Sequence, residues 1–322
     1  MLGIIGMLGA GSEYSRETPG TFPPTHDKDG KFGGPSILDH AATARYLLGR
    51  RTPSGGYSFY RTPQWGVEEP NAPDTLAAIA ALRLIGLAPP NPEVTVRWLR
   101  GLQDATGSWP TLTIGWAALC ALDLLGGKPR CDPRTWLQAQ RHYYLCVSSQ
   151  RHEWRGVLLN LMRLTILMKR YNLPLTDKER VAIGHRLEDS HDPAGGWACP
   201  GADLETTAIA VQLSGCAAIP LDLGTLARWW RRCEDPSLGM RLAPEAGATS
   251  VGALWGGLKL AQLKPRYPRA IAAQLALLQH PEGGLGARHG AIATVKDTYL
   301  GLETETLEFK PLRERHSTNA FI

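Results

Sequence analysis

The stretch GSWPTLTIGWAALCALDLLG, residues 107–126, gives the clearest indication of the architecture. A short turn that ends in an aromatic residue, Gly107-Ser108-Trp109, precedes a helix-length run of residues 113–126 that is apolar on nearly every side. A helix that is apolar all round must be buried on both sides. The stretch therefore predicts an internal helix of a larger helical assembly.

Five other segments resemble this turn and recur at nearly regular intervals along the chain. The third residues of the six segments are 52, 45, 43, 43 and 45 positions apart, and two of the segments are degenerate. The assignment of the two degenerate segments depends on their spacing and on the helical stretches that flank them. The segments are Gly55-Gly56-Tyr57, Gly107-Ser108-Trp109, His152-Glu153-Trp154, Gly195-Gly196-Trp197, Leu238-Gly239-Met240 and Gly283-Gly284-Leu285.

An amphipathic helical stretch precedes each segment, and a more uniformly apolar one follows it. No run of six residues alternates as a strand would, so we expect an all-α protein with essentially no sheet. Neither end has the polar capping repeat of an open solenoid, and six helix pairs suit a closed ring. We expect a single α/α barrel over residues 35–308, an irregular segment 1–34 and a polar tail 309–322. An open superhelix of the same units is the alternative.

Charge and cysteine content exclude several classes of protein. The net charge is +5, and the densest basic cluster, Arg228 with Arg231 and Arg232, fits a solvated helix face better than a nucleic-acid site. The six cysteines show no zinc-type spacing, which fits a reduced cytosol. The apolar start lacks a basic n-region, so we expect no signal peptide and a cytoplasmic location.

The turn segments resemble a known repeat. The pattern Gln103-x3-Gly107-Ser108-Trp109 matches the core of the QW motif of triterpene cyclases, and the wider pattern resembles the prenyltransferase and squalene-cyclase repeat. The resemblance covers residues 35–308 and implies an α6/α6 barrel, with Trp109 tying helices together. Because two enzyme families and some non-enzymes use this repeat, the reaction must be argued from the site.

Acidic residues open three of the apolar helices, at Asp74, at Asp203 with Glu205, and at Asp297. In such a barrel these helix starts lie at one rim, so we expect the acids to converge. A single acid at a helix start is also explained by capping of free N–H groups. A second carboxylate beside a capping one adds repulsion without another cap, so Asp203 with Glu205 is the stronger functional candidate.

The sequence Asp203-Leu204-Glu205-Thr206-Thr207-Ala208 resembles the DxDDTA motif of class II terpene cyclases and its DxDTTA variants. The resemblance implies that Glu205, at the middle acid, is the proton donor. Asp203 would assist it, and Thr206 replaces the third acid. Glutamate in place of the middle aspartate keeps the acid but lengthens its arm by one methylene. The implied activity is protonation of a linear polyprenyl substrate followed by cyclisation.

This chemistry needs an acid that holds its proton and a dry cavity that holds a carbocation. Burial and a neighbouring carboxylate both favour the protonated acid. Aromatic faces stabilise a cation by about 2 kcal/mol when desolvated. The candidates for the cavity wall are Tyr57, Trp65, Trp116, Trp154, Trp197, Trp255 and Tyr299, and ordinary core packing is the alternative for each of them.

Substrate and cofactor expectations depend on the polar end of the substrate. If the substrate carries a diphosphate, Arg61, Arg288 and Lys296 are expected to bind it, and Mg²⁺ would bridge it to Asp74 or Asp297. Class II chemistry otherwise requires no cofactor. No nucleic-acid partner is expected, and peripheral membrane contact for substrate uptake is left open.

Two other functions remain open. A zinc-dependent prenyltransferase β subunit shares the repeat, but the positions of its thiolate and imidazole ligands are occupied here by Glu205 or Thr207 and by Asp297. A barrel that only binds a prenyl chain is the third reading. It has no need of two neighbouring acids, Asp203 and Glu205.

Overall fold

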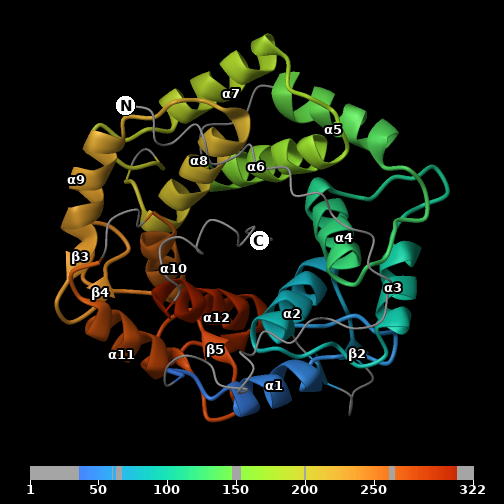
Figure 1. Ribbon diagram of the computed structural model, residues 1–322, viewed down its shortest axis with the longest axis horizontal. Helices are drawn as coiled ribbons and strands as arrows, with labels where there is room; N and C mark the ends of the chain where they lie inside the picture. Colours follow the sequence, from blue (N-terminus) through green and yellow to red (C-terminus); the bar gives the residue numbers. More distant parts are fainter. Residues whose placement is uncertain are drawn as a thin grey trace, which may run out of the picture.

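The structure is a computed structural model that describes residues 36–59, 61–62, 67–146, 154–198, 201–260 and 265–309. In these residues the chain forms twelve α-helices in two concentric rings (Figure 1). The inner ring consists of α2 (Ala72–Leu84), α4 (Leu112–Leu124), α6 (Trp154–Arg170), α8 (Leu204–Ala217), α10 (Val251–Leu260) and α12 (Val295–Phe309). The outer ring consists of α1 (His40–Gly49), α3 (Pro92–Gly101), α5 (Arg134–Cys146), α7 (Asp177–Asp189), α9 (Leu223–Cys233) and α11 (Pro268–Leu278).

The inner ring closes on itself. Each inner helix packs against the next inner helix along the chain, and α12, the last, packs against α2, the first. Outer and inner helices alternate in sequence, so the inner helices all run in the same direction (Figure 1). The all-α barrel of six helix pairs is therefore confirmed, and the open superhelix is excluded.

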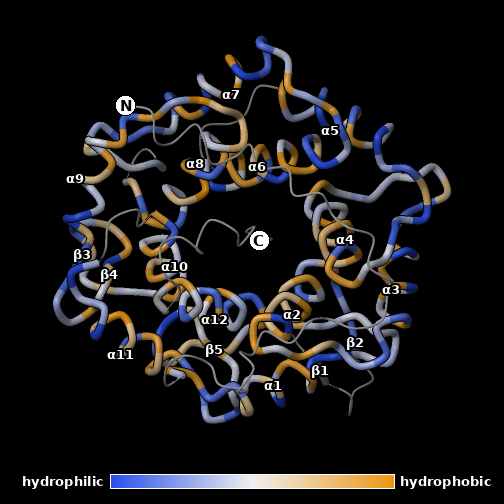
Figure 2. Tube along the Cα trace, in the orientation of Figure 1, coloured by the Kyte–Doolittle hydropathy of each residue, from blue (hydrophilic) through white to orange (hydrophobic). Residues whose placement is uncertain are grey.

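The two rings differ in composition as the sequence predicts. Helix α4 is buried along most of its length, whereas α3 buries only Thr95 and Leu99. Figure 2 shows the same contrast in hydropathy between α4 and the hydrophilic outer faces of α3 and α5. Small residues allow close packing of the rings. A Cβ atom on Gly115 of α4 would overlap the indole of Trp136 on α5.

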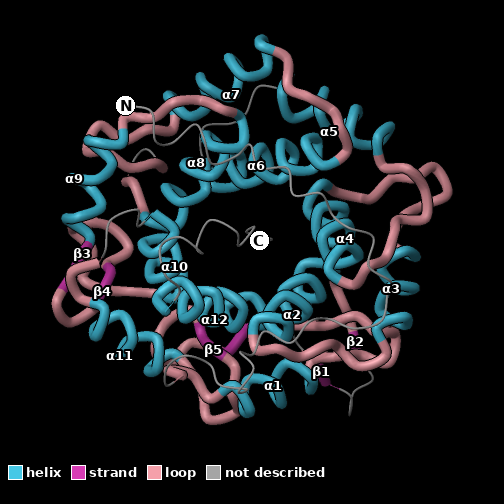
Figure 3. The backbone as a smooth tube through the Cα atoms, in the orientation of Figure 1, coloured by secondary structure: helices cyan, strands magenta, loops and turns pink. Residues whose placement is uncertain are grey.

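Three short β-ladders join the outer and inner helices, so the expected absence of sheet is wrong in detail (Figure 3). Each ladder pairs two antiparallel strands of two residues, which is too short to produce an alternating pattern in the sequence. The strands are β1 (Arg61–Thr62) with β2 (Val67–Glu68), β3 (Glu234–Asp235) with β4 (Gly239–Met240), and β5 (Leu285–Gly286) with β6 (Ala293–Thr294).

Two glutamines link successive outer helices. Gln103, only 1% exposed, donates to the carbonyls of Gly107 and Cys131 and accepts from the Cys131 N–H. Gln279 does the same across the first and last repeats, where its amide bonds to the backbone of Asp39 and Gly283. The glutamine of the QW motif therefore recurs at the seam where the outer ring closes.

The first glycine of the repeated turn has a conformational reason. Gly107 and Gly283 have φ angles of +86° and +100°, a region that residues with a Cβ rarely adopt. At Gly283 a Cβ would also collide with the backbone of Ala42 in α1. The turn thus lets the end of one outer helix lie directly against the next.

None of the described helices has both the length and the apolar composition needed to cross a bilayer. The four cysteines whose side chains the structure describes are free thiols. The positions are Cys120, Cys131, Cys216 and Cys233.

Candidate active site

The inner helices begin with a shared arrangement of polar residues. The side chains of Asn71, Thr111 and Asp203 cap α2, α4 and α8, each by accepting the N–H three residues later. Thr294 accepts the N–H of Asp297 in the same way at the start of α12. Asp203 therefore occupies the capping position that other repeats fill with an uncharged residue.

A buried threonine follows three of these caps, Asn71, Asp203 and Thr294, by four residues. Its hydroxyl accepts the backbone N–H of the third residue of the repeated turn: Thr75 from Tyr57, Thr207 from Trp197 and Thr298 from Leu285. Each bond fixes the start of an inner helix against its turn. The threonine after Asp74 and after Asp297 in the sequence is thus explained by the fold.

Glu205 has neither of these roles, because Asp203 caps α8 and Thr207 bonds to the turn. Its carboxylate pairs with Arg155 at the start of α6 and lies 3.6 Å from the Lys296 ammonium at the start of α12. It also lies against Gly252 of α10, where a Cβ would come within 2.6 Å of Oε2. Side chains of three inner helices meet at this carboxylate, and the missing side chain of Gly252 gives it room.

The charges of this group differ in exposure. The Glu205 side chain is 14% exposed, whereas those of Arg155 and Lys296 are 44% and 49% exposed. Pairs with such exposed cations are screened by water and contribute about 1 kcal/mol or less each. The carboxylate is therefore held in place by cations that can be moved at small cost.

Asp203 and Thr206, the other two motif residues, bond to each other. Asp203 Oδ1 accepts the Thr206 N–H at 2.8 Å, and Oδ2 accepts the Thr206 hydroxyl at 2.8 Å. Thr206 is fully buried. In the described structure Asp203 forms no hydrogen bond with Glu205, so any assistance that it gives acts through the position of α8.

Asp74 accepts hydrogen bonds from two donors. Its Oδ2 accepts the Phe59 N–H at 2.9 Å and the Asn71 side-chain amide at 2.6 Å. Burial raises the pKa of Asp74, and these two donors offset part of the rise. Asp74 is thus an acid with an enhanced tendency to hold its proton, on the helix opposite α8 in the ring.

Asp297 is 8% exposed, and one of its oxygens accepts the hydroxyl of Thr294 at 2.8 Å. Neither Asp297 nor Asp74 makes a hydrogen bond or ion pair with Glu205 among the described residues. The predicted acids therefore share one end of the inner ring without forming a single cluster.

The described aromatic candidates are all buried. Trp197 packs toward the outer ring, since its indole N–H donates to the Leu187 carbonyl of α7 and its ring contacts His191. Burial raises the pKa of Tyr57 to about 12, and its hydroxyl has no partner in the described structure. The other buried candidates are Trp116, Trp154, Trp255 and Tyr299. Trp65 lies outside the described residues.

Trp109 packs as the sequence predicts for a structural residue. Its ring meets Trp136 of α5 edge to face, with centroids 4.9 Å apart. Trp255 instead donates its indole N–H to Glu303, 2.8 Å away on α12. Trp255 is thus bonded to a buried acid of a neighbouring inner helix.

The three basic candidates have separate positions. Lys296 lies beside Glu205, and Arg288 is exposed in the turn between β5 and β6. The side chain of Arg61 lies outside the described residues. Sequence reasoning missed Arg155 and Gly252, which complete the group around Glu205. The sequence offered one indication of Arg155, because this basic residue directly follows Trp154 in a degenerate repeat segment.

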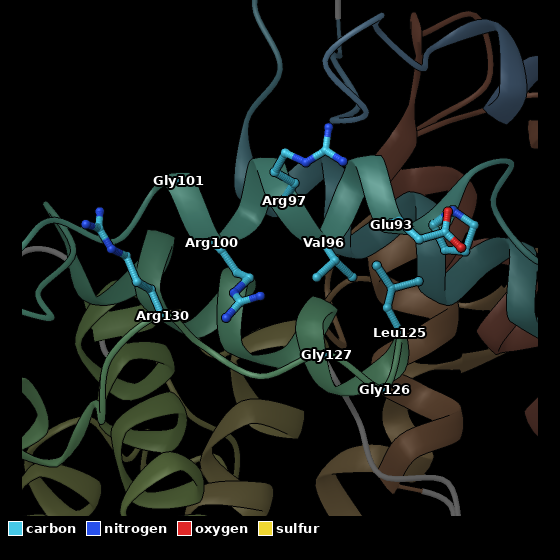
Figure 4. A pocket seen from close by; sticks show the side chains of 10 residues that line it. Glu93, Val96, Arg97, Arg100, Gly101, Leu125, Gly126, Gly127 and Arg130 are labelled. Atoms are coloured by element: carbon cyan, nitrogen blue, oxygen red, sulfur yellow. The ribbon is translucent and has the colours of Figure 1, made fainter. Parts of the chain in front are cut away.

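A cavity of about 620 Å³ lies at the other end of the barrel, between α3 and the turn after α4 (Figure 4). Arg97, Arg100 and Arg130 line it together with Val96 and Leu125. Because it borders the carboxyl end of α4, it contains none of the residues at the inner-helix N-termini. Within the described residues, no three His, Cys, Asp or Glu side chains lie together as metal ligands would.

Comparison with known proteins gives similarity in structure but not in sequence. No family model matches the sequence, and no curated protein matches it. Protein geranylgeranyltransferase-I from Candida albicans, solved with GGPP, superposes with a TM-score of 0.60 at 15% identity, over 84% of this chain and 91% of that one. This chain therefore shares the α/α-barrel fold of that prenyltransferase.

Two further structures show related barrels. A protein from Actinoplanes gives a TM-score of 0.52 at 19% identity, over 84% of this chain and all of that one. A type II terpene cyclase from Scytonema, solved with merosterolic acid A, gives 0.49 at 13% identity, over 83% of this chain and 95% of that one. At identities this low, structural similarity bears on the fold alone, so the reaction has to be argued from the residues at the rim.

Proposed function

We propose that this protein is a class II terpene cyclase, which protonates a linear polyprenyl substrate and closes rings from the resulting carbocation. The observation that supports it most is the position of Glu205. This acid is not used in capping α8, and it lies where side chains of α6, α8 and α12 meet at one end of the ring. A barrel that only binds a prenyl chain has no need of such a group.

The neighbours of Glu205 suit a strong acid. Proton transfer from its carboxyl group to an alkene carbon leaves a carboxylate, and Arg155 and Lys296 are placed to stabilise that carboxylate. Stabilising the product of the transfer lowers its barrier. An oily substrate that covers Glu205 excludes the water that favours ionisation, and this favours the protonated acid before the transfer.

The fold suits the remaining needs of the reaction. Apolar helices form the inner ring, and the indole of Trp255 is held in a fixed orientation by its hydrogen bond to Glu303. An aromatic face stabilises a nearby carbocation by about 2 kcal/mol when water is excluded. Asp203 contributes by capping α8, which fixes the direction of Glu205.

The test is to offer the purified protein farnesyl, geranylgeranyl and geranylfarnesyl substrates, free and as diphosphates, and to analyse the products for rings. Glu205→Gln keeps the size of the side chain and removes the acid. We expect cyclisation to fall by about 100-fold or more, as for loss of a general acid, with an unchanged circular dichroism spectrum. Cyclisation by this variant at the wild-type rate would show that Glu205 is not the proton donor.

Prenyl transfer is the second candidate, and the presence of two cations, Arg155 and Lys296, at the rim favours it. Two cations stabilise the diphosphate that leaves in such a reaction. Product that forms only with a thiol acceptor and zinc would support this function over cyclisation. Tight prenyl binding without any turnover would instead support a binding barrel.

A further inference from the structure

A buried ion pair lies within the inner ring, away from the rim. Glu303 of α12 is 1% exposed, and its Oε1 lies 2.5 Å from the ammonium of Lys259 on α10. Its Oε2 accepts the indole N–H of Trp255 at 2.8 Å. The Lys259 ammonium is also 5.9 Å from the centroid of the Trp255 ring. The sequence analysis did not identify Glu303 or Lys259.

Glu303 lies on the side of α12 that faces away from the outer ring. Glu305, two residues later, accepts the backbone N–H groups of Ile37 and Leu38 and contacts His40 at the start of α1. Residues two apart on an α-helix are separated by about 160° around its axis. Since Glu305 faces α1 in the outer ring, Glu303 lies on the other side of α12, next to α10 of the inner ring.

The ion pair is not explained by the packing of α10 against α12. Other residues close by in the sequence of these helices are buried and apolar, among them Leu258, Leu300 and Leu302. Taking two charges out of water costs several kcal/mol per ion, and apolar residues of similar volume often serve stability as well or better. A buried carboxylate bonded by two donors is therefore a candidate for a chemical role.

We propose that Glu303 is the base that ends the carbocation cascade, an inference that rests on the proposed cyclase function. Its carboxylate takes a proton from the carbon next to the last cationic centre, and the electrons of that C–H bond form the alkene. The substrate gains one proton from Glu205 and loses one to Glu303, so the product is an isomer of the substrate. Glu205 and Glu303 return to their starting forms by proton exchange with solvent.

The geometry supports each part of this role. Lys259 and the Trp255 N–H both interact with the ionised carboxylate, which is the form that accepts a proton. Glu303 follows Lys296 by seven residues, which places it about 10 Å from the rim along α12. The proton thus enters at the rim and leaves about 10 Å deeper, along the direction in which successive rings close. Burial keeps water from capturing the cation before deprotonation.

The deciding experiment is product analysis with Glu303→Gln, whose amide oxygen can still accept the Trp255 N–H. We expect cyclised alcohols, formed by water capture, to replace cyclised alkenes, with the alkene-to-alcohol ratio falling by about 100-fold, as for loss of a general base. Substrate consumption depends on Glu205 and should change far less. Glu305→Gln is the matched control, since it alters a buried carboxylate of the same helix on the outward face, and it should leave the ratio unchanged.

Loss of Glu303 alone leaves Lys259 buried and unpaired, which can prevent folding. The double variant Lys259→Met with Glu303→Gln removes both charges, and it should show the same shift from alkene to alcohol. An unchanged ratio in either folded variant overturns the role of Glu303 and leaves the cyclase function standing. Absence of any cyclised product from the wild-type protein overturns the cyclase function and this inference with it.

Discussion

Glu205 differs from every other polar residue at the start of an inner helix because no local rule explains it. Asp203 caps α8, and Thr207 anchors the turn, as Asn71 and Thr75 do for α2. The position two residues before the anchoring threonine is proline in α2 and Lys296 in α12. An acid at this position, 3.6 Å from the ammonium of Lys296 of α12, indicates a local function added to a repeated scaffold.

Gly252→Ala tests whether the position of Glu205 matters. The added methyl group would come within 2.6 Å of Glu205 Oε2, and the flexible end of that side chain has to move. We expect cyclisation to fall by about tenfold or more, because small displacements of reacting groups are costly, while unfolding free energy changes by about 1 kcal/mol or less. Product formation and urea unfolding measure the two effects.

Gly256→Ala, one turn later on α10, is the matched control. There the added methyl would meet the backbone carbonyl of Leu204 at 2.6 Å, which cannot move without shifting α8. This variant should lose more stability than Gly252→Ala. Equal activity of Gly252→Ala and the wild type would contradict a requirement for the observed position of Glu205.

At the level of the helices, the two outer helices α5 and α7 are held together by an ion pair rather than by apolar contacts alone. The guanidinium of Arg141 bonds to both oxygens of Glu179, at 2.5 and 2.6 Å. Glu179 also completes the capping box of α7 with Thr176. The hydrogen bond from Arg141, with those from Thr176, holds the pKa of Glu179 down at about 2.

This pair predicts a pH dependence of stability. Because the pKa of Glu179 is lower in the folded chain than in the unfolded chain, its stabilisation is fully present above the unfolded value of 4.5 and is lost as pH falls to about 2. Glu179→Gln keeps the capping box and should lower the unfolding free energy at pH 7 by about 1–2 kcal/mol. In urea titrations the gap between variant and wild type should narrow between pH 4.5 and 2.

Asp177→Asn is the control for that measurement. Asp177 lies on the same helix and pairs with Arg180, but its side chain is 97% exposed. Its substitution should leave stability nearly unchanged at every pH. A constant gap between Glu179→Gln and the wild type down to pH 2 would refute the role of the Arg141 pair.

At the level of the whole molecule, the closed ring makes the first and last repeats neighbours. Gln279 at the end of α11 bonds to Asp39 and Thr43 at the start of α1, as Gln103 joins α3 to the segment before α5. These bonds span 240 and 236 positions of the sequence for Gln279 and 28 for Gln103. Closure therefore uses the same kind of contact as the step from α3 to α5.

Substitution of Gln279 tests closure in solution. Gln279→Ala removes the hydrogen bonds across the seam to Asp39 and Thr43, each of which contributes about 0.5–1.5 kcal/mol. We expect it to destabilise the protein about as much as Gln103→Ala, as measured by urea unfolding. In an open superhelix α1 and α11 would lie far apart, and Gln279→Ala would then have almost no effect.

The sequence alone determined the helices, their alternation between amphipathic and apolar, and the number of pairs. These features depend on local periodicity and on turns such as Gly107-Ser108-Trp109, which are formed by residues close together in the chain. Ring closure was also correctly predicted. The short ladders were missed, because two-residue strands leave no periodic pattern to detect.

Tertiary structure decided which side chains meet at the rim and inside the ring. Periodicity placed Glu205 at the start of an inner helix, but its contacts with Arg155 and Lys296 depend on the rotation of three helices about their axes. The pairing of Glu303 with Lys259 depends on the same rotations and on the orientation of Trp255. Such rotations are set by the packing of the whole closed ring, so residues distant in sequence become partners only when the barrel is complete.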